Sequence, residues 1–145
     1  MKLMKELGAA ALVLGSLIAT TQIALAHGDV TPQPIDTTGL KPIGATVLKE
    51  NPYRGNPLAI KIGEHGYSQN CDRCHGLGGV SGGISPDLRK MDPGKEGDEW
   101  YLTRSLKGSV KNDRVLMPKF EGILSQEGLW AIRSWLDTLP PPDDN

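Results

Sequence analysis

The sequence predicts an all-α fold with long connecting loops. Three segments combine a capping residue, apolar residues three or four positions apart and a terminating Gly or Pro, which are signs of a helix. They cover residues 57–71, 99–107 and 126–139. The connecting chain is rich in Gly and Pro, with 18 and 11 residues in total, and it shows no convincing strand pattern. The 145 residues leave room for one domain.

The first 26 residues predict a secretory signal peptide. Two lysines form a basic start, an apolar run follows over residues 7–18, and Ala24-Leu25-Ala26 matches the small-x-small cleavage pattern. The run is too short to read as a membrane-spanning helix, although an uncleaved N-terminal anchor is the alternative. We therefore expect export and a mature chain that begins at His27.

The mature chain is expected to begin and end outside the helices. Residues 27–56 carry four prolines and no sustained periodicity, which predicts an extended arm that lies over the domain or is partly mobile. The helical domain would span residues 57–139, and residues 140–145 would form a short acidic tail. The formal net charge of −1 gives no reason to expect nucleic acid or an anionic membrane as a partner.

The first helix is predicted from its cap. Asn56 is a good N-cap, and Pro57 suits the first helical position. Gly63 is a poor helix former, so we interpret it as the point where another helix approaches closely. The residues expected on the inner face are Leu58, Ile62 and Tyr67.

The later helices are predicted in the same way. Asp98 could cap a helix over residues 99–107 that stops at Gly108, and residues 109–121 are expected to be irregular. Ser125 could cap the last helix, which Pro140 would end. Its apolar residues, at three- and four-residue steps, are Leu129, Ile132, Leu136 and Leu139.

The chemistry of the chain centres on Cys71-Asp72-Arg73-Cys74-His75. C-x-x-C-H is the attachment signature for c-type haem. Two cysteines one helical turn apart can form thioethers to the two vinyl groups of a porphyrin, and His75 can then bind the iron through its imidazole. The chain has only one Phe, three Tyr and three Trp, so one buried porphyrin would also supply apolar area.

Three other interpretations of the cysteine pair fit the sequence less well. Structural zinc needs about four N or S ligands, and the adjacent Cys74 and His75 are awkward ligands for one tetrahedral ion. A thioredoxin-like redox pair needs a βαβ setting that the sequence does not show. A plain disulfide would constrain little chain at this spacing.

The second axial ligand decides what a bound haem can do. Met117 follows His75 by 42 positions and precedes Pro118. A thioether there would favour ferrous iron and raise the reduction potential. The alternatives are Met91, His65 and an open site, which would suit a haem enzyme or a gas sensor. For the second ring nitrogen of His75, the Pro86 carbonyl is a candidate acceptor, although Pro86 could merely stiffen its loop.

With these residues, the chain resembles class I monohaem cytochromes c from about residue 58 to residue 139. Gly63, Tyr67 and Cys71 are similar to the N-terminal helix of that family, and Ile132 and Trp135 to the residues that pack across the glycine from the C-terminal helix. The resemblance implies three to five helices wrapped around one haem, with the first and last helices crossing. It also implies Pro86 as the acceptor for His75 and Met117 as the second ligand.

Three further segments, at residues 27–33, 51–56 and 120–125, resemble the PedF-like periplasmic cytochromes c. That resemblance implies a periplasmic, monomeric one-electron carrier and not an enzyme. It would take electrons from a PQQ-dependent alcohol dehydrogenase that oxidises ethanol, methanol or a related alcohol, and pass them through a terminal oxidase or another cytochrome to the respiratory chain. A haem subunit fixed in a larger oxidoreductase is the alternative.

Two sets of residues outside the motif are functional candidates. Three aromatic residues, Trp100, Tyr101 and Trp130, could pack on the porphyrin or belong to the core. Seven cations could form a basic rim that steers an acidic partner, or an ordinary solvated surface. These cations are Arg54, Arg73, Arg104, Lys107, Lys111, Arg114 and Lys119.

Overall fold

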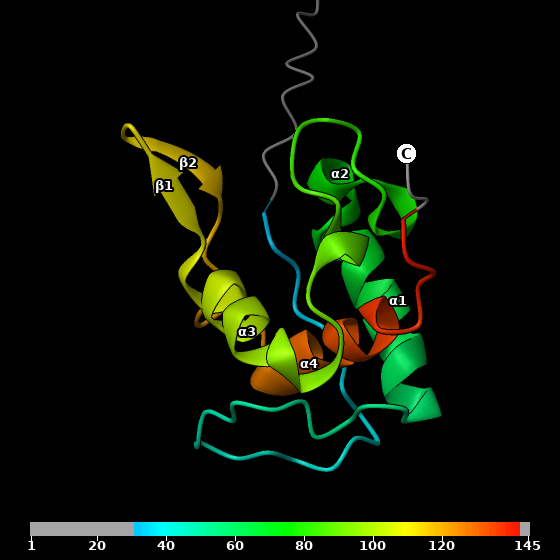
Figure 1. The fold of residues 1–145 in the computed structure, drawn as a ribbon. Helices are drawn as coiled ribbons and strands as arrows, with labels where there is room; N and C mark the ends of the chain where they lie inside the picture. Colours follow the sequence, from blue (N-terminus) through cyan, green and yellow to red (C-terminus); the bar gives the residue numbers. More distant parts are fainter. Residues whose placement is uncertain (1–30, 143–145) are drawn as a thin grey trace, which may run out of the picture.

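The computed structural model describes residues 31–142, and the predicted signal peptide lies outside them (Figure 1). This mainly helical architecture confirms the predicted fold class. No helix within residues 31–142 combines the length and the apolar character that crossing a bilayer requires. The α-helices are α1 (Pro57–Asn70), α2 (Asp72–His75), α3 (Asp98–Lys107) and α4 (Gln126–Leu136). Three short 3₁₀ turns are η1 (Leu77–Gly79), η2 (Leu88–Lys90) and η3 (Gly94–Glu96), and the strands are β1 (Ser109–Lys111) and β2 (Arg114–Met117).

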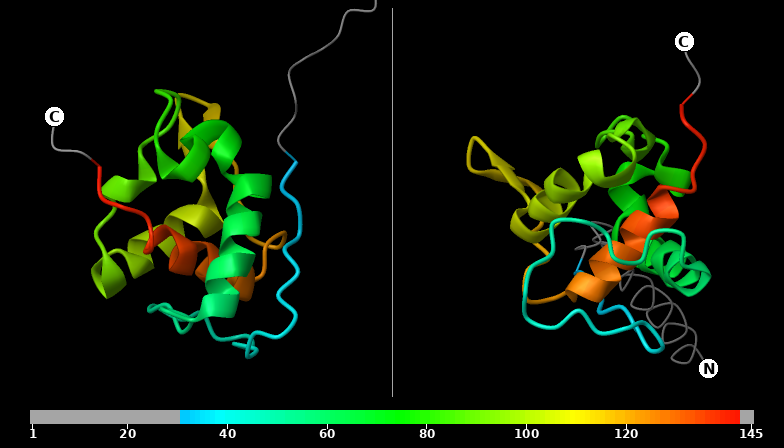
Figure 2. Two further views of the ribbon diagram at one scale, coloured as in Figure 1. Left: turned by 90° about the vertical axis from the view of Figure 1, so that its right-hand side faces the viewer. Right: turned by 60° about the horizontal axis from the view of Figure 1, so that its bottom comes forward.

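Helices α1 and α4 cross at the centre of the molecule (Figure 2). They share the most extensive contact between elements in the described part of the chain. The crossing point is Gly63, where an added Cβ would lie 1.9 Å from the carbonyl oxygen of Ala131. Only a residue without a side chain allows the two backbones to approach this closely. The predicted role of Gly63 is therefore confirmed.

The predicted inner face of α1 was partly wrong. Leu58 is 40% exposed, whereas Ala59, one position further, is fully buried. Tyr67 is buried as predicted, and Ile62 is half-buried against the core. The helix turns its small residues toward α4 because the close crossing leaves no room for a branched side chain there.

Helix α4 supplies most of the core. The Ser125 hydroxyl accepts a hydrogen bond from the Gly128 N–H at 3.1 Å, which confirms the predicted cap. Leu136 ends the helix three positions before the predicted end, but Leu139 still packs against the core. Trp135 was expected to cover Gly63. It lies instead beside Tyr67, one turn further along α1, with ring centroids 4.6 Å apart.

Residues 109–117 form a β-hairpin where irregular chain was expected. Lys111 pairs with Arg114 and Val110 with Val115 in antiparallel register. Asn112 and Asp113 connect the strands with φ values of 50° and 59°, the left-handed conformation of a type I′ turn. Asn and Asp tolerate this conformation better than other residues with side chains, so this dipeptide was the sequence signal for the hairpin.

Asp98 was predicted to cap α3 and instead lies inside the molecule as the first residue of the helix. Its carboxylate accepts hydrogen bonds from Arg133 Nε at 3.0 Å, from an Arg54 guanidinium nitrogen at 2.6 Å and from the Asn51 N–H at 2.8 Å. Arg54 and Arg133 both also pair with Asp137. Arg54 is therefore part of this buried ion cluster, which we define as Arg54, Asp98, Arg133 and Asp137, and not of a basic rim.

Residues 31–56 contain no helix or strand and are held to the helices by backbone N–H groups. The N–H of Gln33 donates to Asn70 at 2.7 Å, that of Ile43 to Glu127 at 2.8 Å, and that of Leu48 to Gln126 at 2.7 Å. Figure 2 shows this segment running beside α1 and then under α4. Side chains of α1 and α4 thus accept the backbone hydrogen bonds that a strand would make to a neighbouring strand in a sheet.

Candidate haem site

The motif forms a tight helical turn at the end of α1. The Cys71 N–H donates to the Tyr67 carbonyl at 2.8 Å, and the N–H of His75 donates to the Cys71 carbonyl at 2.9 Å. Gly76 ends the turn with a φ of 78°, which favours glycine. The thiols of Cys71 and Cys74 are unbridged, and both residues are partly buried.

His75 is oriented by the loop that follows it. Its Nδ1 lies 2.9 Å from the Pro86 carbonyl oxygen, which can only accept a hydrogen bond. Nδ1 therefore carries the proton, and Nε2 keeps the lone pair that binds a metal. This is the contact that the resemblance to class I cytochromes c implied for Pro86, which the spacing alone had left open. Asp87 steadies the adjacent chain because its carboxylate accepts from the Arg89 N–H at 2.9 Å and from the Arg89 guanidinium at 2.7 Å.

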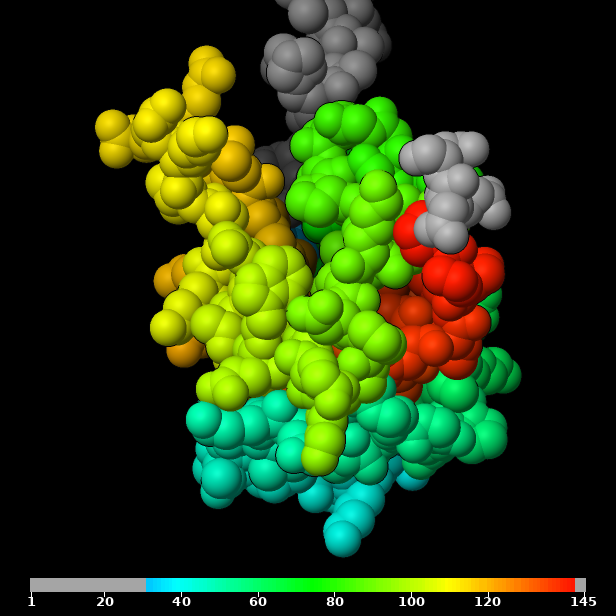
Figure 3. Space-filling view, viewed as in Figure 1, coloured from blue at the N-terminus to red at the C-terminus, as the bar shows by residue number. Residues whose placement is uncertain are grey.

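A hollow separates the motif from the hairpin (Figure 3). Helix α2, which contains Cys74 and His75 and follows Cys71, lies on one side of the hollow, and β2 lies on the opposite side (Figure 1). Met117 is the last residue of β2 and is half-buried against the core. The fold thus brings the cysteines, His75 and Pro86 together, and it places the strand that ends at Met117 across from them.

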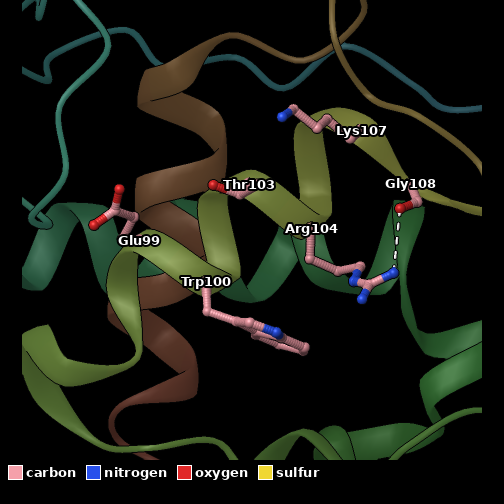
Figure 4. Close-up of a pocket in the computed structure, with 6 residues that line it drawn as sticks. All are labelled: Glu99, Trp100, Thr103, Arg104, Lys107 and Gly108. Carbon is pink, nitrogen blue, oxygen red and sulfur yellow. Dashed lines mark hydrogen bonds between the residues drawn. The ribbon is translucent and has the colours of Figure 1, made fainter.

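The face of α3 adds a third side with a depression of about 540 Å³. Figure 4 shows Trp100 and Arg104 pointing the same way from α3, with the Arg104 guanidinium 5.6 Å from the centroid of the Trp100 ring. Trp100 is 53% exposed. Tyr101 and Trp130, by contrast, are buried in the core, so the packing interpretation holds for both. The sequence did not single out the pairing of Trp100 with Arg104, although their four-residue spacing on a helix was the available signal.

The residues of the hollow fit a c-type haem. The donor set comprises two thiols, an imidazole and a thioether, which are the groups such a haem uses. The segments around the hollow also leave large apolar side chains uncovered, which an apolar planar group could cover. These side chains are Leu77, Val80, Ile84, Trp100, Val110, Val115 and Leu116. Within residues 31–142, no three His, Cys, Asp or Glu residues gather closely enough to hold a metal ion.

Comparison with known proteins decides the family. The family described as cytochrome c oxidase, cbb3-type, subunit III matches residues 58–136. A cytochrome c550 of Pseudomonas aeruginosa is 52% identical over 132 residues, which cover 88% of this chain and 90% of that protein. The chain belongs to the cytochrome c family. Membership in this family implies a covalently bound haem c and a role in electron transport.

This cytochrome c is also similar to part of two larger proteins from Pseudomonas putida. Quinohemoprotein alcohol dehydrogenase ADH IIB is 32% identical over 85 residues, and quinohemoprotein alcohol dehydrogenase ADH-IIG is 35% identical over 78 residues. The matched segments make up 12% and 10% of those proteins. The likeness is therefore confined to one small segment of each.

Burial raises the pKa of two groups at the start of the motif. Burial, with the nearby Asp72 and Cys74, raises the pKa of the Cys71 thiol to about 12. Burial also raises the pKa of Tyr67 well above its usual value. The Tyr67 hydroxyl donates to the Gly76 carbonyl at 2.6 Å and so ties α1 to the end of the motif. No pattern in the sequence indicated this contact between Tyr67 and Gly76.

Proposed function

We propose that this cytochrome c is a periplasmic one-electron carrier that holds one haem c and accepts electrons from a PQQ-dependent alcohol dehydrogenase. It would pass them to a terminal oxidase or another cytochrome. The observation that carries the proposal is the His75 ring, which lies 2.9 Å from the Pro86 carbonyl oxygen that orients it. Helix α2, which ends at His75, lies across the hollow from strand β2, which ends at Met117. Such an arrangement suits an iron bound on both faces and closed to substrates.

Each site residue has a separate role in this proposal. Cys71 and Cys74 would hold the haem through thioethers, His75 would bind the iron through Nε2, and Met117 would supply the second ligand. The Pro86 carbonyl keeps the proton of the ring on Nδ1. When bound, the haem supplies reversible one-electron transfer at its iron, and the soft Met117 thioether favours the reduced state.

The alcohol dehydrogenase partner follows from the relatives. Two proteins named quinohemoprotein alcohol dehydrogenases contain a segment similar to this chain, so a separate cytochrome could serve a dehydrogenase that lacks this segment. Oxidation of an alcohol to an aldehyde releases two electrons and two protons. Two molecules of this protein would therefore accept one electron each for every alcohol oxidised.

Replacing Met117 by Leu tests the axial ligand. Leu has about the volume of Met but no sulfur, so the fold should tolerate the change at a cost below about 1.5 kcal/mol. We expect the variant to lose the weak ferric absorption band at the red end of the spectrum and to bind carbon monoxide. The reduction potential of its haem should decrease, by an amount within the roughly 0.8 V range over which axial ligands tune this potential.

Met91→Leu is the matched control. Met91 is half-buried and packs against the same core, so the substitution removes a thioether at similar burial. We expect the red-end band and the potential of this variant to match those of the wild type. Loss of the band in Met91→Leu, or its retention in Met117→Leu, would show that the ligand has been assigned to the wrong methionine.

Two measurements test the rest of the proposal. The mass of the mature protein should equal residues 27–145 plus one haem, and any other mass contradicts the cleavage site or the haem count. A purified quinoprotein alcohol dehydrogenase supplied with ethanol should reduce the ferric protein in a stopped-flow experiment. Gel filtration of the two proteins together should show separate peaks, because co-elution at low concentration would indicate a fixed subunit.

A further inference from the structure

The direction of the Pro86 carbonyl group depends on the residues on both sides of it. This carbonyl belongs to the planar peptide group that ends at the Asp87 Cα, so the position of Asp87 sets where its oxygen points. On the other side, the proline ring fixes the φ angle of Pro86. The oxygen lies 2.9 Å from His75 Nδ1 in this orientation of the peptide plane. A residue that holds Asp87 in place therefore also holds the contact to His75.

Arg89 holds Asp87 through three hydrogen bonds. One carboxylate oxygen accepts from the Arg89 N–H at 2.9 Å and from Nε at 3.1 Å, and the other accepts from a terminal guanidinium nitrogen at 2.7 Å. The two guanidinium bonds form a fork, which is the strongest and most directional contact between an arginine and a carboxylate. Mainly through this side-chain hydrogen bonding, Arg89 lowers the pKa of Asp87 to about 2. The fork is therefore ionised well below neutral pH.

The fork is seated on the domain. The side chains of Asp87 and Arg89 are only 13% and 16% exposed. A Cβ added to Gly79 would lie 3.5 Å from the Arg89 Cγ and 3.1 Å from the Leu139 Cδ1, so the stem of Arg89 packs on η1 beside the end of the core. Leu88, between the two charged residues, is partly buried against the same core. Packing on two sides gives the fork a fixed position that a solvated surface pair lacks.

The chain before Pro86 is tied by Ser81. The Ser81 hydroxyl donates a hydrogen bond to the Ser85 carbonyl and accepts one from the Gly83 N–H, at 2.9 Å in the second case. Ser85 directly precedes Pro86, so the peptide groups on both sides of the proline are held. The fork is the charged one of these two ties.

We propose that Asp87 and Arg89 are positioning residues that set the strength of the hydrogen bond from His75 to the Pro86 carbonyl, and through it the reduction potential of the haem iron. The inference rests on the proposed function, in which His75 binds the iron. A strong bond from Nδ1–H leaves more electron density on the ring and makes the imidazole a more basic ligand. A more basic ligand stabilises ferric iron and lowers the potential. Breaking the fork should therefore raise it.

Two substitutions separate positioning from charge. Asp87→Asn removes a negative charge and Arg89→Gln removes a positive one, so a Coulombic effect on the iron would shift the potential in opposite directions. Both substitutions break the fork, so positioning predicts a rise in potential in both. The potentials of the haem-loaded proteins are measured by spectroelectrochemistry at high ionic strength, which screens the charge difference. Opposite shifts, or the wild-type potential in both variants, overturn the proposal.

Arg89→Lys tests the fork without a change in net charge. Lysine keeps the positive charge but cannot make two parallel bonds to one carboxylate. We expect the potential to rise in this variant too, and this result stands even if Asp87→Asn fails to fold. The matched control is Asp92→Asn, which removes the same charge at an exposed residue five positions after Asp87. The control should keep the wild-type potential, and a shift equal to that of Asp87→Asn would overturn the proposal.

The Nδ1 proton of His75 gives a second readout that does not involve electron transfer. Its exchange with solvent is followed by NMR of the reduced, haem-loaded protein. We expect roughly tenfold faster exchange in Asp87→Asn and Arg89→Lys, because a hydrogen bond to a charged group contributes about this much to local stability. Exchange at the wild-type rate in both variants overturns the positioning and leaves the proposed function in place. A wild-type spectrum in which the haem ring current does not shift this proton shows that His75 is not the ligand and overturns both.

Discussion

Gly63→Ala should separate α1 from α4 and lower the free energy of unfolding by about 3 kcal/mol or more, at the upper end of the usual cost of overpacking. The added Cβ would lie 1.9 Å from the Ala131 carbonyl oxygen and 2.4 Å from its carbon. Both are backbone atoms in the middle of a helix, so no side chain can rotate away to make room. The measurement is guanidinium unfolding of the haem-loaded protein, followed by circular dichroism.

Gly66→Ala is the matched control for this substitution. It lies one turn along the same helix and is also buried, but the nearest atom to its added Cβ is the Ile35 Cδ1, at 2.7 Å. That atom is the end of a flexible side chain and can move. Both substitutions gain about 1 kcal/mol of helix propensity, so their difference isolates the backbone clash. Equal unfolding midpoints would contradict the crossing at Gly63.

Asp98→Asn should lower the free energy of unfolding strongly, although the two side chains have nearly the same shape. It removes the negative charge closest to the guanidinium of Arg133, which is 2% exposed, and leaves Asp137, at 3.4 Å, as the remaining carboxylate beside it. Removal of one partner from a buried ion pair costs about 3–5 kcal/mol. The control is Glu99→Gln, since Glu99 pairs with Lys49 in solvent and such pairs contribute about 0–1 kcal/mol. A similar loss in both variants would contradict a special role for the buried ion cluster.

The effect of Asp98→Asn should also depend on pH. Burial alone would raise the pKa of Asp98, but hydrogen bonds from Arg54, Asn51 and Arg133 outweigh it and hold the pKa below its usual value. A lowered pKa means that the carboxylate stabilises the fold above an unfolded-state pKa of about 3.9. This contribution is lost as the pH falls through the lower, folded-state pKa. The stability curves of the wild type and Asp98→Asn should therefore converge below about pH 4.

Asp137 acts in the opposite direction within the same cluster. Burial raises its pKa despite the neighbouring Arg133 and Arg54. Its ionisation therefore costs stability as the pH rises through its folded-state pKa. The Asp98 charge adds to this rise, so Asp98→Asn should lower the pKa of Asp137, and the difference between the two stability curves reports on the coupled pair of Asp98 and Asp137. Parallel curves from pH 6 to pH 3 would contradict the lowered pKa.

The features that the sequence predicted correctly are local ones. Asn56 and Ser125 cap helices through contacts within four residues, and such contacts follow from residue type and position. The spacing of Cys71, Cys74 and His75 is equally local. Gly63 is the exception, because its meaning depends on a helix far along the chain. It was predictable because a glycine inside an amphipathic helix has few other uses.

The features that the sequence did not predict depend on distant partners. Asp98 precedes a helical pattern like an ordinary cap, and only Arg133 and Arg54, both remote in sequence, draw it inside. The hairpin was missed because its two strands are three and four residues long and carry charges at the turn. That length is too short for an alternating pattern to become visible. Asn112-Asp113 was the remaining signal, and it is shared with many irregular loops.

The hydrogen bond between His75 and Pro86 fixes both ends of the loop formed by residues 76–85. The entropic cost of closing a loop rises only with the logarithm of its length, by roughly 0.6 kcal/mol for each doubling. Gly82 lies within this stretch, and a Cβ added to it would have no neighbour within 4 Å. The loop could therefore be lengthened at Gly82, or carry an inserted tether to an electrode, without moving the His75 imidazole. The stretch closest to the proposed iron site is in this way also one of the most open to redesign.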